Sequence, residues 1–217
     1  MAGQARLLPR ISTPEALVSE LKAAILHGSL PGGSRLTEID LAETHGVSRQ
    51  SIKQALLELS RLGLVEQRRH RGVWVRELTL ADVEDLYWTR YVIESEAASY
   101  AALEPTSWGR VQRCVEQLER LPADAAWSEV VEADWHFHRE LVASVGSVRL
   151  SRVHDLLEGE TLLSFMRCDY DAPAAVAQVH RALFEVIRTG DPTASTRALR
   201  LHLEAGKQLV FENRFSR

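Results

Sequence analysis

The chain has 217 residues, 45% of them hydrophobic, which is enough for two small domains or one large one and argues against a disordered protein. The net charge of −4 hides an asymmetry, because residues 1–76 hold 11 Lys and Arg against 7 Asp and Glu, while the rest of the chain is acidic. A basic first third and an acidic remainder predict two domains with different partners.

Targeting and redox features predict a cytoplasmic protein without a membrane partner. No apolar run reaches the length of a membrane span, and the first residues, MAGQARLLPR, lack the apolar core of a secretory signal. Cys114 and Cys168 have no CxxC-type partner, so we expect a reducing environment and no disulfide framework.

The basic first third predicts three helices followed by a β-hairpin. The expected elements are an arm over 1–12, a helix over 13–27 capped by Ser12 or Thr13, a helix over 37–44, a helix over 48–62 and a hairpin over 64–75. Thr37 with Asp40 resembles a capping box, and Gly46 breaks the second helix in a tight turn. Two helices joined by such a turn form a helix-turn-helix.

The N-terminal residues of the second helix in such a motif lie against base edges. Arg49 can make a bidentate contact to guanine, and Gln50 can do the same to adenine. Ser48, Ser51 and Lys53 are residue types that more often hold phosphates. The hairpin tip is the predicted wing, and its residues are Arg69, His70, Arg71 and Gly72. A solvated amphipathic helix is the alternative, but the wing directly after it favours DNA binding.

The acidic remainder is helical to its end. Six helices are expected, over about 79–104, 106–121, 127–145, 147–168, 174–189 and 192–211. The predicted fold is therefore mostly α: an N-terminal winged helix-turn-helix over 13–76 with a small β-hairpin wing, and a C-terminal all-α bundle of about six helices over 77–217. Trp88, Trp135 and Phe165 are expected to pack in the bundle core.

Four residues of the bundle have the chemistry of metal ligands: Asp134, His138, His180 and His202. The first two lie four apart and share one helix face, and the other two lie on two later helices. Bundles build internal metal sites from facing helices in this way, and the ligand set suits Zn, Ni, Fe or Mn alike. Spacing alone leaves this a minority interpretation, because His136 and His154 are equally eligible by residue type.

The segment LKAAILHGSLPGGSRLTEIDLAETHGVSRQSIKQALLELSRLGLVEQRRHRGVWV follows one family pattern almost end to end. Residues 14–76 thereby resemble the winged-helix domain of the GntR regulator family. The resemblance implies that Arg35 contacts phosphate or base and that Arg49 is the main specific contact, assisted by its helix neighbours and the wing tip. The family usually has Pro where this chain has Ser51 and Arg where it has Lys53, which makes Lys53 a poorer base contact.

Three later segments, DWHFHREL, VHRALFEVIRTGD and RALRLHLEAG, carry a second resemblance. Residues 80–213 resemble the FCD domain of the FadR branch of GntR regulators, and the six-helix count resembles its VanR-like subgroup. The resemblance implies that Asp134, His138, His180 and His202 hold a divalent metal, and that His136 and His154 are structural or solvated. Arg90, in an Arg-x-x-x-Glu pattern with Glu94, either binds an effector carboxylate or forms an ordinary helix pair.

These features predict a bacterial-type DNA-binding regulator, a repressor, that acts as a homodimer on a palindromic operator. A small organic acid bound at or near the metal would control its affinity for double-stranded DNA. The alternatives are a metal-dependent enzyme of the His/carboxylate type and an effector-independent structural DNA binder. We predict that the protein is not an enzyme, because the sequence has neither an HExxH motif nor a nucleophile elbow.

Overall fold

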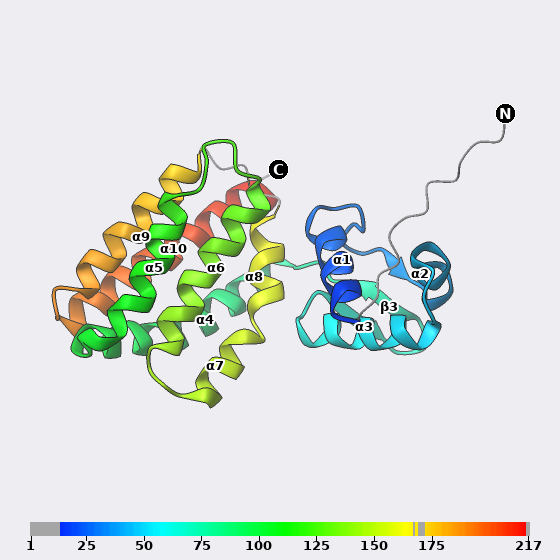
Figure 1. Ribbon diagram of the computed structural model, residues 1–217, viewed down its shortest axis with the longest axis horizontal. Coiled ribbons are helices and arrows are strands. Elements are labelled where there is room, and N and C mark those ends of the chain that lie inside the picture. Colours follow the sequence, from blue (N-terminus) through cyan, green and yellow to red (C-terminus); the bar gives the residue numbers. More distant parts are fainter. Residues whose placement is uncertain (1–13, 167, 169–171, 216–217) are drawn as a thin grey trace. The chain divides into compact units, whose positions relative to one another are not determined.

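A computed structural model describes residues 14–166, 168 and 172–215 (Figure 1). The chain divides into two compact units, and the boundary falls between Glu77 and Leu78. The predicted arm over 1–12 and the predicted caps Ser12 and Thr13 lie outside the described residues. None of the described helices is long and apolar enough to cross a membrane.

The first unit is a three-helix domain closed by a small antiparallel sheet. Its elements are α1 (Pro14–Leu26), β1 (Arg35–Leu36), α2 (Glu38–His45), α3 (Arg49–Arg61), β2 (Val65–Arg68) and β3 (Gly72–Val75). The strand order is β1-β3-β2, and Val65 lies opposite Val75 in the hairpin. Strand β1 was not predicted, because two residues are too short to show an alternating pattern; Arg35 pairs there with Trp74.

Local chemistry fixes the helix-turn-helix as the sequence predicts. Thr37 Oγ1 accepts a hydrogen bond from the Asp40 amide and caps α2, and Ser48 Oγ accepts one from the Ser51 amide and caps α3. Gly46 ends α2 in the left-handed region at φ 63°, which favours glycine, and its N–H donates to Ala42 O. The turn therefore starts α3 directly after α2 and exposes its first residues.

The second unit is an all-α bundle. Its helices are α4 (Leu80–Leu103), α5 (Trp108–Glu119), α6 (Trp127–Ala143), α7 (Val148–Asp155), α8 (Glu158–Phe165), α9 (Pro173–Ile187) and α10 (Pro192–Arg214). Helix α10 packs along α4, and α5 packs on both α6 and α9 (Figure 1). The predicted mostly α class and bundle are confirmed, but the helix expected over 147–168 is interrupted, and the N–H of Leu157 bonds to His154 O at 2.9 Å in the break.

The aromatic predictions for the bundle are only partly correct. Trp135 and Phe165 are buried, as expected, but Trp88 is 62% exposed and contacts Tyr91 on the surface of α4. The reason is the helical period: neighbouring residues point about 100° apart, so the burial of Tyr87 against the bundle turns Trp88 outward. A core role for Trp88 is therefore wrong.

Candidate metal centre and DNA surface

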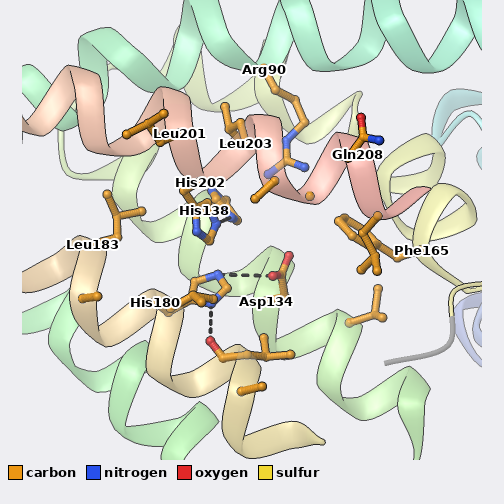
Figure 2. Close-up of a pocket in the computed structure, with 18 of the residues that line it drawn as sticks. Arg90, Asp134, His138, Phe165, His180, Leu183, Leu201, His202, Leu203 and Gln208 are labelled. Carbon is orange, nitrogen blue, oxygen red and sulfur yellow. Dashed lines mark hydrogen bonds and ion pairs between the residues drawn. The ribbon is translucent and has the colours of Figure 1, made fainter. Parts of the chain in front are cut away.

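The four predicted ligands converge from three helices in the bundle interior. Asp134 and His138 lie on α6, His180 on α9 and His202 on α10, and all four side chains point toward one another (Figure 2). We call these four residues the Asp/His cluster. One ligand atom from each residue lies within 4.8 Å of the other three, so the set could hold a metal ion.

A hydrogen bond of His180 to the backbone turns the lone pair of its other ring nitrogen into the cluster. His180 Nδ1 donates to Val176 O at 2.7 Å, so its neutral ring carries no proton on Nε2. That Nε2 is buried and 3.2 Å from Asp134 Oδ1, yet it makes no hydrogen bond within the described part of the chain. A lone pair facing a carboxylate oxygen is repulsive unless a proton or a metal ion lies between the two atoms. The orphaned atom therefore fits a metal ligand.

Glu94 orients the third ligand from a fully buried position on α4. Its Oε2 accepts a hydrogen bond from His138 Nδ1 at 2.6 Å, which leaves His138 Nε2 facing His202 Nε2 at 3.1 Å. Its Oε1 accepts from Arg90 Nε at 2.8 Å and from His154 Nε2 at 3.1 Å. A carboxylate behind a histidine ligand is the usual second layer of a protein metal site.

Sequence reasoning did not assign this role to Glu94. The Arg-x-x-x-Glu pattern placed it beside Arg90, but no signal connected it with His138, 44 residues away. His154, which the sequence left as structural or solvated, is fully buried on α7, where its ring stacks on Trp135 at 4.5 Å.

Burial and charge favour the protonation states of Asp134, His138 and His202 that a metal needs. Burial lowers the pKa of His138, although Glu94 opposes it, and burial followed by the neighbouring histidines holds the pKa of His202 well below its ordinary value. Burial is the largest cause and acts to raise the pKa of Asp134 and of Glu94, but the neighbouring groups together outweigh it, so both pKa values are lowered. The largest opposing contribution comes from His180 for Asp134 and from Arg90 for Glu94. Neutral imidazoles and an ionised carboxylate are the ligating forms.

A cavity of about 790 Å³ adjoins the Asp/His cluster. Arg90 lines it, and Figure 2 shows this side chain reaching from α4 toward the cluster. The ordinary helix pair with Glu94 is present, through Nε of Arg90. However, the buried Nη2 of Arg90 has no hydrogen-bond partner among the described residues, so the pair leaves a cationic donor available.

The predicted DNA contacts of α3 lie at its N-terminal end. Arg49, Gln50 and Lys53 are exposed, and Arg49 Nη2 lies 3.6 Å from Glu38 Oε2. Ser48 and Ser51 share a hydrogen bond of 2.8 Å between their hydroxyls, so both oxygens are already engaged in the cap.

The wing presents cations at its tip. Arg69, His70 and Arg71 are exposed, and His70 has a left-handed backbone at φ 61°. Gly72 follows at φ 85°, and a Cβ built there would lie 3.6 Å from Arg35 Nε. Strand β1 therefore brings Arg35 beside the wing tip, although it is distant from the tip in sequence.

A winged helix-turn-helix with exposed cations on α3 and the wing, followed in one chain by a helical domain, defines a two-domain DNA-binding regulator. Residues 13–75 match the bacterial regulatory proteins of the gntR family, and residues 85–205 match the FCD domain. The chain belongs to the GntR family of transcription regulators and carries an FCD domain at its C-terminal end.

Full-length relatives agree with this assignment. The chain is 26% identical to the "Probable D-xylose utilization operon transcriptional repressor" of Paenarthrobacter nicotinovorans over 94% of this chain and 92% of that protein. It is 30% identical to the HTH-type transcriptional regulator BphR of Paraburkholderia xenovorans, over 90% of this chain and 84% of the relative. A crystal structure of a GntR regulator from Rhodococcus sp. RHA1 aligns with a TM-score of 0.77 at 26% identity, covering 92% and 97% of the two chains. These relatives are transcription regulators and not enzymes.

Proposed function

We propose that the protein is a repressor whose affinity for a palindromic operator falls when a small carboxylate binds beside a metal in the bundle. The observation that carries this proposal is the Asp/His cluster, together with the orphaned Nη2 of Arg90 in the same cavity. The relative from Paenarthrobacter nicotinovorans bears a repressor's name, which supports the direction of control.

Asp134, His138, His180 and His202 would hold the ion, which is Zn, Ni, Fe or Mn. When bound, the ion supplies positive charge and open coordination positions that attract an anionic ligand. Arg90 is a second cation beside that ligand, and its guanidinium can make a bidentate contact to a carboxylate. The hydrogen bond from Arg90 Nε to Glu94 fixes the orientation of the guanidinium.

We infer that the DNA surface consists of the exposed start of α3 and the wing. Its residues are Arg35, Ser48, Arg49, Gln50, Ser51, Lys53, Arg69, His70, Arg71 and Gly72. Arg49 supplies the main base contact, because it is an exposed guanidinium on the first turn of the recognition helix. Ser48, which caps α3, and Ser51, whose amide bonds to it, lie at this exposed helix start, where we infer that they contact phosphates.

A homodimer is supported by an apolar stripe on α4. Trp88, Val92 and Leu103 are all more than half exposed and fall on one side of the helix. A two-fold dimer would cover this stripe and supply the two recognition helices that a palindromic operator needs.

The location that matches this function is the cytoplasm, with the protein at the nucleoid when DNA is bound. The VanR-like subgroup stays a prediction, because it depends on counting α7 and α8 as one interrupted helix.

The test is a gel shift on the DNA upstream of the protein's own gene, with Zn²⁺-loaded protein and a panel of carboxylates. We expect retardation that a carboxylate reverses, and reversal should be lost in Arg90→Ala. Retardation that no carboxylate changes would favour the effector-independent DNA binder. No retardation on any upstream fragment would contradict the repressor proposal itself.

A further inference from the structure

We propose that the effector is a monocarboxylic acid with an apolar body, and not a polyhydroxylated acid; this rests on the proposed function. The cavity that adjoins the Asp/His cluster has charged groups at one end and hydrocarbon over most of the remaining wall. The carboxylate of the ligand should lie at the charged end, and its apolar body should lie along the hydrocarbon wall.

The charged end is formed by the Asp/His cluster and Arg90. Figure 2 shows the guanidinium of Arg90 and the carboxylate of Asp134 on opposite sides of the space beside the histidines. Arg90 Nη2 is buried and makes no hydrogen bond in the described part of the chain, and this side chain is only 1% exposed. Burying a guanidinium N–H without a hydrogen-bond partner is unfavourable, and an anion bound beside it would remove that cost.

The remaining wall is mostly aliphatic and aromatic. It includes Val130, Val131, Phe165, Val176, Leu183 and Leu203. Trp127 Nε1 donates to the backbone oxygen of Phe165 at 2.9 Å, so its polar atom is already engaged. Gln208 and Glu212 are exposed and hydrogen-bonded to each other at 3.1 Å. A hydroxyl carried into this wall would therefore lose its water without gaining an equivalent partner.

Tyr87 offers the one further polar atom of the buried wall among the residues described. Its Oη approaches the side chain of Ser164 but has no hydrogen-bond partner in the described part of the chain. Burial raises the pKa of this phenol, with the charge of Arg90 opposing, so it stays a neutral hydroxyl. One such group can serve one ligand oxygen, whereas a sugar acid carries a hydroxyl on nearly every carbon.

Gly206 allows two aromatic side chains of the cavity wall to pack closely against α10. It lies on α10 one turn after His202, and a Cβ built on it would lie 3.3 Å from Phe165 Cζ and 3.4 Å from Tyr87 Oη. Alanine suits a helix interior better than glycine, but a Cβ here would force Phe165 or Tyr87, which both line the cavity, to shift. The missing side chain thus lets Phe165 and Tyr87 pack on α10, where both form part of the wall that an apolar ligand body would contact.

The first test is calorimetric titration of Zn²⁺-loaded, full-length protein with acetate, butyrate, hexanoate and gluconate. Affinity should rise about fourfold for each added methylene along the aliphatic series. Gluconate, which has the carbon chain length of hexanoate, should bind more weakly than hexanoate. Equal affinities along the series, or tighter binding of gluconate, would overturn this inference and leave the carboxylate effector standing. If none of the four acids gave measurable binding heat, both the effector proposal and this inference would be overturned.

The second test uses Gly206→Ala, with Gly109→Ala as the matched control. Gly109 is an exposed helical glycine on α5 whose added Cβ meets nothing closer than Arg113 Nη1 at 3.8 Å. Only Gly206→Ala should weaken hexanoate binding, by about fourfold or more, while acetate binding holds in both variants and both unfold cooperatively in a thermal melt. Unchanged hexanoate affinity in a folded Gly206→Ala protein would overturn the assignment of this space to the ligand body.

Discussion

Replacing Glu94 by glutamine removes the negative charge from the centre of its buried hydrogen-bond network but keeps the volume of the side chain. The carboxylate accepts from His138 at 2.6 Å, from Arg90 at 2.8 Å and from His154 at 3.1 Å. An amide has one acceptor oxygen and one donor group, so it cannot accept on both sides. If its oxygen serves Arg90 and His154, its NH₂ faces His138 Nδ1 and favours the tautomer that is protonated on Nε2. That tautomer cannot ligate a metal through Nε2, the atom that faces the cluster.

Two magnitudes follow from this geometry. Arg90 is 1% exposed and forms an ion pair with Glu94, which the substitution breaks. Breaking a buried ion pair lowers the free energy of unfolding by about 3–5 kcal/mol. Removing the group that orients a histidine ligand lowers metal affinity about 10- to 100-fold. Both exceed what a surface carboxylate contributes, which is about 0–1 kcal/mol.

The assay is urea unfolding of the metal-free protein, paired with Zn²⁺ competition against a chromophoric chelator. The matched control is Glu185→Gln on α9, because Glu185 is half-exposed and pairs with Arg188 at the surface. Gel shifts of both variants report whether the DNA-binding unit is intact. Equal metal affinities for the Glu94 and Glu185 variants would refute the assignment of Glu94 as the residue that orients His138.

Three further predictions concern the cluster and the DNA surface. His138→Ala should abolish stoichiometric Zn²⁺ in metal analysis, while His136→Ala, outside the cluster, should keep it; equal metal content would remove the site. Arg49→Ala should weaken binding to the operator by about 1–3 kcal/mol and relax its specificity, whereas Arg61→Ala, at the far end of α3, should match wild type in a fluorescence anisotropy titration. Burial holds the pKa of His138 and His202 below the ordinary 6.5, so as the pH falls the unfolded chain binds protons before the folded chain does. The free energy of unfolding of the metal-free protein should therefore fall as the pH drops from about 6.5. A free energy of unfolding that rises as the pH drops would contradict this.

The sequence by itself determined the features that depend on residues within a turn of one another. Thr37 and Ser48 cap their helices three residues ahead, and Gly46 ends α2 through its own backbone freedom. Such contacts need no knowledge of the rest of the fold. Spacing also placed Asp134 and His138 on one helix face, but a family resemblance was needed to choose the two later histidines.

Tertiary structure decided everything that depends on how the helices pack. It joined Glu94 to His138 and to His154, which are 44 and 60 residues away, and so made one network of residues that the sequence treated separately. It turned Trp88 outward, and it placed Gly206 against Phe165 at the edge of the cavity. A single sequence shows which residues share a helix face, but not which other face each one meets, because packing angles depend on the side chains of both helices at once.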